Sequence, residues 1–347
     1  MKKFLSIALA LLMVCVMLPV VALAAEKTAS TYEELKSAIS TANDGDTIKL
    51  LADIDLSQTI TVNKTITLNM NGKKLYNTSD LWDKPTAEAG NWSLISVRGS
   101  GNLTITGNGT FAAKENDCYA VDVKESATVT IKNGTFIGNI HAVYVFAGTA
   151  NVEGGTYSVQ QKYPDSAKGD EFVLNCYDAN RANGTARINV TGGTFKNFNP
   201  ADNKAEGEGN NFADNSLVVQ KNNTVQNNDY YVGNAANEVI AAASKGEEIF
   251  VLNGTTLTNV PAGVIIQNRT GDRITVNGKD VELTGDAGYT VPASNITIIV
   301  PGDTTPAETP KTEDQKNPST GANDFVGLAA AAAVVALLGS AVVLRKK

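Results

Sequence analysis

Short runs of alternating apolar and polar residues recur along the middle of the chain. The clearest are residues 103–106, 128–132, 149–153 and 186–190. Alternation with a period of two predicts β-strands that bury one face. Each run is followed by an Asn-Gly or Gly-Gly turn, which supplies the positive φ that a tight reversal needs. A threonine and an aromatic residue complete the phrase, and these aromatic residues are Phe111, Phe136, Tyr157 and Phe195.

The phrase repeats at an interval that is typical of a solenoid. Successive aromatic positions are 25, 21 and 38 residues apart, and the longest interval fits one coil plus an insertion around residues 162–170. No such unit can bury its apolar face alone, so the coils must stack. We therefore expect an all-β solenoid in which the four aromatic side chains form an internal ladder. A β-sandwich also uses short strands and turns, but turn phrases at a coil-like period favour the solenoid.

A short amphipathic segment precedes the first strands and predicts a capping helix. Thr31 and Glu34 form a capping box at its start, and Leu35, Ala38 and Ile39 share one face of residues 31–42. A helix in this place covers the open end of a solenoid, whose edge strands would otherwise pair with other chains.

The same plan returns later in the chain. Residues 238–243 are again helix-like, residues 249–252 read as a strand, and residues 274–279 echo the earlier run 66–73. We therefore expect a β-helix domain over residues 26–233 and a smaller second β unit, with its own short helix, over residues 234–300.

The beginning of the chain predicts a secretory signal peptide over residues 1–25. Lys2 and Lys3 precede an apolar stretch that extends to residue 21, and Ala22-Leu23-Ala24 supplies small residues for cleavage after Ala24 or Ala25. The alternative is an uncleaved membrane anchor.

The end of the chain resembles a Gram-positive cell-wall sorting signal, over residues 317–347. A pentapeptide and an apolar segment, residues 325–344, are followed by a basic tail. A linker rich in Pro and Thr, residues 301–316, precedes this signal. The resemblance implies that a sortase cuts after the threonine and joins it to peptidoglycan, after the apolar segment has held the chain briefly in the membrane. The pentapeptide is Asn317, Pro318, Ser319, Thr320 and Gly321. Because the commonest form begins with Leu, Asn317 leaves the sortase class open.

The net charge limits the classes of partner that the chain is expected to bind. The chain has 29 basic and 36 acidic residues. The predicted signal peptide and sorting signal together contain five of the basic residues and one of the acidic residues. Residues 25–320 therefore contain 24 basic and 35 acidic residues, a net charge of −11. Nucleic acid and anionic membranes are therefore poor partners, whereas cations and neutral glycans suit the surface.

Cys118 and Cys176 either form a disulfide or lie buried separately. His141 occupies the phase of Tyr119 one coil earlier, which favours packing.

The helix-then-strand opening at 32–51 and the Gly-Thr-Phe/Tyr coils resemble the pectin-lyase-like family of right-handed parallel β-helices. The resemblance spans most of residues 30–232, and the segment 192–203 is similar to one found in repeat-built bacterial surface proteins. The family includes polysaccharide lyases and hydrolases, tailspikes and adhesin-like proteins, so the resemblance implies a fold and leaves function open.

An enzyme of this class would need carboxylates or a basic residue on adjacent coils. The candidate catalytic residues are Asp122, Asp178 and Arg181, none of which lies in a recognisable catalytic phrase. Asp44 and Asp46 are candidate Ca²⁺ ligands, although a turn that ends the first helix also explains them. The alternative for the three catalytic candidates is that they are solvated charges on turns.

Aromatic side chains in the segment that interrupts the coils are candidates for sugar binding. Trp82 and Trp92, with Tyr76 beside them, either stack on sugar rings or pack against the solenoid. We expect a surface protein attached to the cell wall that acts as an adhesin-like or glycan-binding module, and is not an enzyme. The alternative is a wall-attached polysaccharide lyase or glycoside hydrolase.

Overall fold

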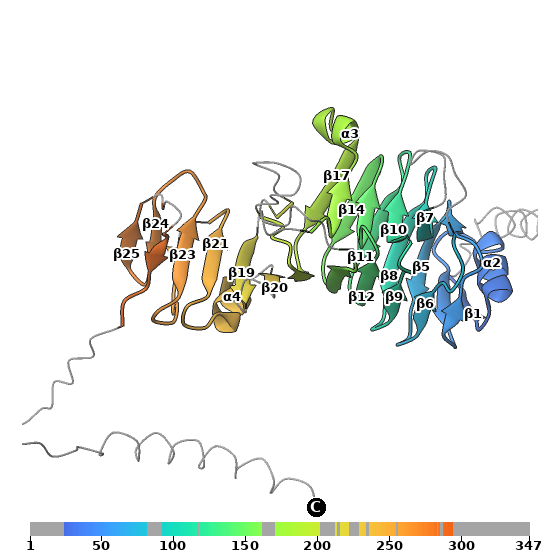
Figure 1. The fold of residues 1–347 in the computed structure, drawn as a ribbon, viewed down its shortest axis with the longest axis horizontal. Helices are drawn as coiled ribbons and strands as arrows, with labels where there is room; N and C mark the ends of the chain where they lie inside the picture. The colour runs from blue at the N-terminus through green and yellow to red at the C-terminus, as the bar shows by residue number, and fades with distance from the viewer. Residues whose placement is uncertain are drawn as a thin grey trace, which may run out of the picture. The chain divides into compact units, whose positions relative to one another are not determined.

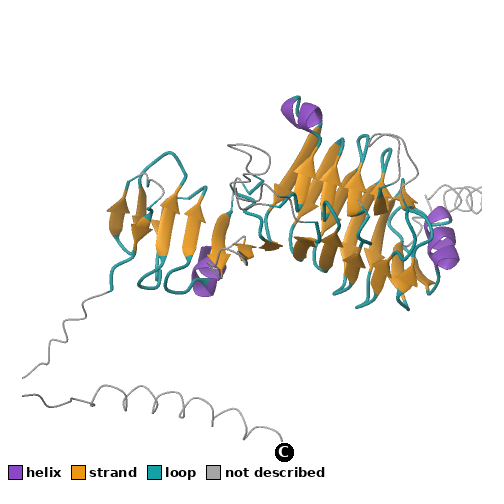
Figure 2. Ribbon diagram, in the orientation of Figure 1, coloured by secondary structure: helices purple, strands orange, loops and turns teal. Residues whose placement is uncertain are grey.

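The computed structural model describes the greater part of residues 24–293. The described residues are 24–81, 92–116, 118–161, 171–201, 212–213, 216–221, 229–233, 236–254, 256–282, 284 and 287–293. The predicted signal peptide up to residue 23, the linker and the whole sorting signal lie outside them. Strands dominate the described chain, and the three helices are short (Figure 2). Within the described residues, no helix combines the length and the apolar composition needed to cross a bilayer.

The chain from β1 to β18 coils through three parallel sheets in a fixed order. Each coil contributes one strand to sheet A, then one to sheet B and one to sheet C, so equivalent strands of successive coils lie side by side (Figure 1). Sheet A contains β1 (Glu26–Ala29), β2 (Thr47–Leu50), β5 (Thr65–Asn69), β8 (Asn102–Thr106), β11 (Thr128–Ile131), β14 (Gly148–Val152) and β17 (Ala186–Val190).

The other two sheets follow the same stacking. In sheet C the strands are β4 (Ile60–Val62), β7 (Ser93–Val97), β10 (Tyr119–Val123), β13 (Val143–Val145) and β16 (Leu174–Cys176). The coil part of sheet B contains β3 (Ile54–Asp55), β6 (Lys74–Tyr76), β9 (Thr110–Ala112), β12 (Thr135–Gly138), β15 (Thr156–Val159) and β18 (Gly193–Lys196). The predicted all-β parallel β-helix is therefore confirmed.

The predicted aromatic ladder lies on the core-facing side of sheet B. Phe111, Phe136, Tyr157 and Phe195 are in register on successive strands and fully buried. Their ring centroids are 4.7, 5.1 and 5.0 Å apart, with neighbouring ring planes within 12° of parallel. Because stacked aromatic pairs add about 0.5–1.5 kcal/mol to the effect of burial alone, the ladder fixes both the register and the spacing of the coils.

The helix α2 (Tyr32–Ser40) covers the first coil, as the capping pattern predicts. The hydroxyl of Thr31 accepts a hydrogen bond from the Glu34 amide at 3.2 Å, and the Glu34 carboxylate accepts one from the Ser30 amide at 2.7 Å. The return bond of the capping box therefore reaches the residue before the cap. The apolar face of Leu35, Ala38 and Ile39 is buried in the first core.

Beyond β18 sheet B continues, but most of the strand pairs that follow are antiparallel. The added strands are β20 (Asp229–Gly233), β19 (Leu217–Lys221), β21 (Glu248–Val251), β23 (Ile265–Asn268) and β26 (Tyr289–Thr290), in that spatial order. The helix α4 (Ala236–Ala242) buries Val239 and Ile240 beside them. A small sheet D completes this part, with strands β22 (Thr256–Leu257), β24 (Ile274–Val276) and β25 (Lys279–Val281).

Two hydrophobic cores meet at this change of pairing. On β19, Val218 belongs to the core of the β-helix, whereas Leu217 and Val219 belong to the second core. On β21, Phe250 faces the first core while its neighbours face the second. Alternation along a strand directs successive side chains to opposite faces, so one sheet serves both cores. The domain boundary predicted after residue 233 thus lies within a continuous sheet and stays a prediction.

Candidate functional site

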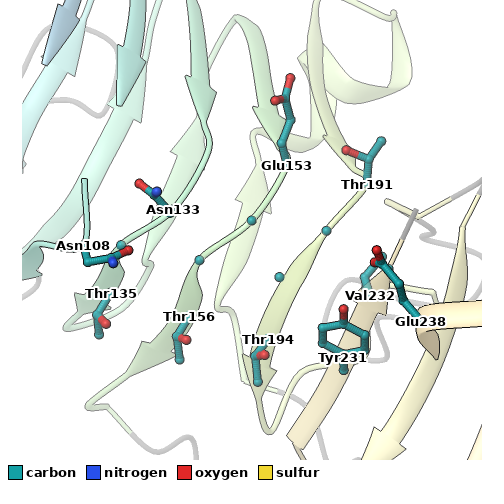
Figure 3. A pocket seen from close by; sticks show the side chains of 16 residues that line it. Asn108, Asn133, Thr135, Glu153, Thr156, Thr191, Thr194, Tyr231, Val232 and Glu238 are labelled. Atoms are coloured by element: carbon teal, nitrogen blue, oxygen red, sulfur yellow. The ribbon is translucent and has the colours of Figure 1, made fainter. Parts of the chain in front are cut away.

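A polar groove of about 550 Å³ lies where the last coils of the β-helix meet β20 and α4. Figure 3 shows it from close by, with the coil turns on one side and Tyr231 and Glu238 on the other. Its volume is in the range of sites that bind small molecules. The lining residues are Asn108, Asn133, Gly134, Thr135, Glu153, Gly154, Gly155, Thr156, Thr191, Gly192, Gly193, Thr194, Tyr231, Val232, Gly233 and Glu238.

The floor of the groove is glycine backbone, because the coils leave no room for side chains there. Gly134, Gly155 and Gly193 have φ of +116°, +103° and +121°, a region that favours glycine. A Cβ added to Gly155 would lie 2.9 Å from the carbonyl oxygen of Gly134, and one on Gly193 would lie 3.1 Å from that of Gly155. Coil stacking thus requires glycine at these positions. Because glycine has no side chain, a ligand can approach the backbone of the floor closely.

A row of threonines lines the groove on the outward face of sheet B. Thr135, Thr156 and Thr194 are in register on β12, β15 and β18, each immediately before a ladder aromatic. Successive side chains of a strand point to opposite faces, so the hydroxyls face outward while the rings face the core. The amide of each threonine donates to a glycine carbonyl of the preceding coil at 2.8 Å. The backbone of the row is therefore hydrogen-bonded at every coil.

The turns before these strands supply amide and carboxylate groups. Asn108 and Asn133 lie on equivalent turns, and Glu153 lies on the next (Figure 3). Glu153 is exposed and forms an ion pair with Lys132 at 2.8 Å. The side-chain oxygen of Asn133 is buried and has no hydrogen-bond partner among the described residues.

The opposite wall comes from the antiparallel part of sheet B. Tyr231 on β20 pairs with Thr194 on β18, which places the ring beside the threonine row. Glu238 is exposed in the first turn of α4. The groove therefore combines hydroxyls, amides and carboxylates with one aromatic side chain. This mixture suits a polyhydroxylated ligand, whose hydroxyls both donate and accept hydrogen bonds.

The catalytic candidate Asp122 lies elsewhere, on the face of sheet C that points away from the ladder core. Its side chain is fully buried, and Lys124 Nζ lies 3.5 Å from its carboxylate. Arg98 Nε donates to Ser96 Oγ at 2.8 Å in the neighbouring strand. Burial raises the pKa of Asp122, and the charge of Lys124 opposes this shift. The arrangement is a buried ion pair with polar neighbours.

The other two catalytic candidates form a separate surface pair. Asp178 and Arg181 lie on α3 (Asp178–Ala182), 3.3 Å apart, and the Asp178 side chain is 79 % exposed. The helix follows β16, two coils beyond the strand of Asp122. The structure therefore brings Asp178 and Arg181 together but leaves Asp122 in a different environment.

The candidate Ca²⁺ ligands hold backbone amides. Asp46 is 2 % exposed and accepts hydrogen bonds from the Ala25 and Asn43 amides at 2.8 and 2.9 Å, and Asp44 accepts one from the Thr65 amide at 3.0 Å. These bonds account for both oxygens of Asp46. In the described part of the chain no three His, Cys, Asp or Glu side chains converge as a metal site.

The aromatic candidates are divided between described and undescribed residues. Trp92 stacks on Tyr119 with ring centroids 6.1 Å apart, which is a packing contact between neighbouring coils. Tyr76 is half-buried, and Lys74 Nζ lies 4.7 Å from its ring centroid. Trp82 lies outside the described residues, so its role in sugar binding stays a prediction.

Two cysteines, Cys118 and Cys176, and the histidine are buried. Cys118 and Cys176 are separate thiols, and burial followed by the charge of Asp122 raises the pKa of Cys118 to about 12. His141 packs against Tyr119 and Tyr144, with ring centroids 4.8 and 5.3 Å away. Its Nδ1 lies 2.7 Å from the Phe172 carbonyl oxygen, and burial lowers its pKa to about 4.

Sequence reasoning missed the residues that line the groove, although part of the signal was present. The threonine before each ladder aromatic is recognisable from the repeated phrase, and alternation places it outside. Glu238 and Tyr231 reach the groove through antiparallel pairing of β20 with β18, which no local pattern indicates.

Comparisons with protein-family models, with curated proteins and with solved structures give no match to this chain.

Proposed function

We propose that this chain is a secreted surface protein, attached to the cell wall by a sortase, that binds neutral or basic glycans in the groove beside α4. The observation that carries the binding proposal is the groove itself, with its rigid threonine row, its amide groups and Tyr231. Wall attachment is supported by the order of pentapeptide, apolar segment and basic tail in residues 317–347.

The charge of the groove supports neutral or basic sugars over acidic ones. Glu153 and Glu238 are both exposed at its rim, and residues 25–320 carry a net charge of −11. A negative field repels anionic ligands and slows their association, most strongly at low ionic strength. Polysaccharides rich in uronate or sulfate are therefore expected to bind weakly.

The rigid floor supports binding of an extended chain with several weak contacts. The glycine turns and the threonine row repeat once per coil, so equivalent polar groups recur at the strand spacing of about 4.8 Å. Many copies on a wall surface would bind a polymer with an avidity far above that of a single site.

An enzyme would need several carboxylates on one face across consecutive coils. On the outward face of sheet C, the register positions aligned with Asp122 are Thr61, Ser96, Tyr144 and Asn175. Asp122 is thus the single carboxylate of that row. Thr110, Thr135, Thr156 and Thr194 form the corresponding row of sheet B.

The test is a panel of soluble neutral, basic and acidic oligosaccharides titrated into the secreted chain without residues 317–347, with product formation followed in parallel. We expect binding to neutral or basic members, weaker binding to acidic members and no new reducing ends. Two matched variants test the site. Thr156→Val, in the groove, should lose binding, whereas Thr104→Val, on sheet A, should keep it. Binding confined to acidic members, or release of products, would replace this proposal.

A further inference from the structure

The first residues of the coil stack hold a buried carboxylate. The amide of Ala25 donates to Oδ1 of Asp46 at 2.8 Å, and the amide of Asn43 donates to Oδ2 at 2.9 Å. Asp46 is 2 % exposed. A buried carboxylate is stable only when its oxygens have donors, so Ala25 supplies half of what Asp46 needs.

Both backbone groups of Ala25 are fixed. Its carbonyl accepts a hydrogen bond from the Thr47 amide at 2.8 Å, and the strand β1 begins at the next residue, Glu26. Ala25 is therefore the first residue of the ordered parallel stack. Ala25 is exposed, like Ala24, and is distinguished by these two backbone hydrogen bonds.

The charges around Asp46 favour a cation at Ala25. Hydrogen bonds from the Ala25 and Asn43 amides hold the pKa of Asp46 below its ordinary value, with smaller contributions from Lys27 and Lys64. Lys64 Nζ donates to the carbonyl oxygens of Ala42 and Ser40. Asp44 in the same turn accepts from the Thr65 amide. The carboxylate facing Ala25 is thus ionised, and no side-chain cation of the described residues forms an ion pair with it.

The two cleavage sites that the sequence allows differ in their effect on the hydrogen bond between the Ala25 amide and Asp46. Cleavage after Ala25 removes the Ala25 amide, leaves Oδ1 of Asp46 without its donor, and places the bulkier Leu23 three residues before the cut. Cleavage after Ala24 places Ala22 and Ala24 at the two small-residue positions of an A-x-A site.

We infer that the Ala24–Ala25 peptide bond is the leader-peptidase site and that the new amino terminus binds Asp46. Hydrolysis adds one water across the bond, leaving a carboxylate on Ala24 and an ammonium on Ala25. The hydrogen bond from a neutral amide to the ionised carboxylate of Asp46 becomes an ion pair between an ammonium and that carboxylate. Removal of the leader thereby strengthens the contact that holds the first residue of the coil stack. The inference rests on the secretion included in the proposed function, and is independent of the groove.

The first experiment is amino-terminal sequencing of the full chain, secreted with its own leader from a Gram-positive host. We expect Ala25-Glu26-Lys27 as the first three residues. A first residue of Glu26 would overturn this inference and leave secretion intact, whereas a retained leader would contradict secretion as well.

The second experiment measures the coupling between the amino terminus and Asp46. The melting temperature of the chain that begins at Ala25 is compared with that of a chain extended upstream by two glycines, each with Asp46 or Asp46→Asn. We expect the free terminus to raise the melting temperature by about 2–4 °C with Asp46 present and to lose this advantage in Asp46→Asn. Asp44→Asn, in the same turn, is the control that should keep it.

A separate readout serves if Asp46→Asn does not fold. In the unsubstituted mature protein, the pKa of the α-amino group of Ala25 should lie above the ordinary value of about 7.7–8.0, as followed by NMR. An α-amino pKa at or below that ordinary value would overturn the inference.

Discussion

The β-helix and the second β unit are built from the same short strands and glycine turns, but their cores are held together differently. In the β-helix every strand pairs in parallel with its equivalent one coil earlier, and stacked aromatic rings run through sheet B. In the second unit parallel and antiparallel pairs are mixed, and the buried core is aliphatic. Repetition therefore fixes register in the first region, whereas individual contacts must fix it in the second.

The difference between the regions also explains where the groove forms. A parallel stack presents the same surface at each coil, so it produces flat faces. The antiparallel pairing of β20 with β18 ends this repetition and brings α4 beside the coil turns. The groove thus joins a repeated, rigid wall to a unique wall that carries Tyr231 and Glu238.

The largest expected effect comes from breaking the aromatic ladder. Phe136→Ala removes a fully buried ring that stacks on both neighbours, and such truncations destabilise by about 3–5 kcal/mol. Ile266→Val in the second core removes one methylene, at a loss of about 0.5–1.5 kcal/mol. Urea unfolding of both variants measures the difference. Equal losses would mean that the ladder does not dominate the stability of the β-helix.

Breaking the buried ion pair of sheet C is expected to have an effect nearly as large. Asp122→Asn removes the carboxylate that pairs with Lys124, which is 2 % exposed, and removal of one member of a buried pair destabilises by about 3–5 kcal/mol. Replacing both, with Asp122→Asn and Lys124→Met, should recover most of the loss. If the double variant is as unstable as the single one, the pair has a role beyond neutralising Lys124.

The single histidine offers a pH test confined to the β-helix. Its pKa is lowered to about 4 from an ordinary value near 6.5, so the neutral form is favoured in the folded state. The stability it contributes is complete above pH of about 6.5 and is lost as pH falls toward 4, by about 3 kcal/mol in total. Asp122, with a raised pKa, changes stability in the opposite sense over part of this range.

The histidine contribution is isolated by comparing variants. His141→Gln keeps an amide near the Phe172 carbonyl and removes the titrating group, so the difference in unfolding free energy between it and the unsubstituted chain should vary between pH 4 and 6.5. His141 is the chain's only histidine. A difference that is constant with pH would show that burial does not depress this pKa.

A smaller effect separates the two kinds of glycine turn. Gly155→Ala combines a positive φ with a Cβ only 2.9 Å from the Gly134 carbonyl oxygen, whereas Gly246→Ala in the second unit has a positive φ and open space. The positive φ alone costs about 1–2 kcal/mol, so Gly155→Ala should lose more than Gly246→Ala. Thermal unfolding compares them. A larger loss at Gly246 would contradict the account of the groove floor.

The fold was predictable where the chain repeats. Alternation and the Gly-Thr-aromatic phrase indicated the sheet A strands and the ladder, and the capping box at Thr31 indicated α2. Sheet C was less visible, because β7 and β10 are buried on both faces and do not alternate. The five-residue helix α3 was not expected, since so short a helix has no apolar period to detect.

The site was much less predictable than the fold. The candidates Asp122, Asp178 and Arg181 were chosen for their chemistry, but Asp122 is buried in sheet C and the other two lie on α3. The groove depends on β20 returning to pair with β18, a contact between segments more than thirty residues apart. Sequence periodicity describes neighbours along a coil and contains no information about such a return.

The most direct test of the groove as a glycan site compares two tyrosines. Tyr231→Ala removes the ring from the groove, and Tyr177→Ala removes a ring that is 40 % exposed and stacks on Phe146 away from the groove. Titration of the best neutral or basic oligosaccharide is predicted to show affinity weakened about tenfold by Tyr231→Ala and unchanged by Tyr177→Ala. Unchanged affinity in Tyr231→Ala, with the fold intact by circular dichroism, would contradict the account.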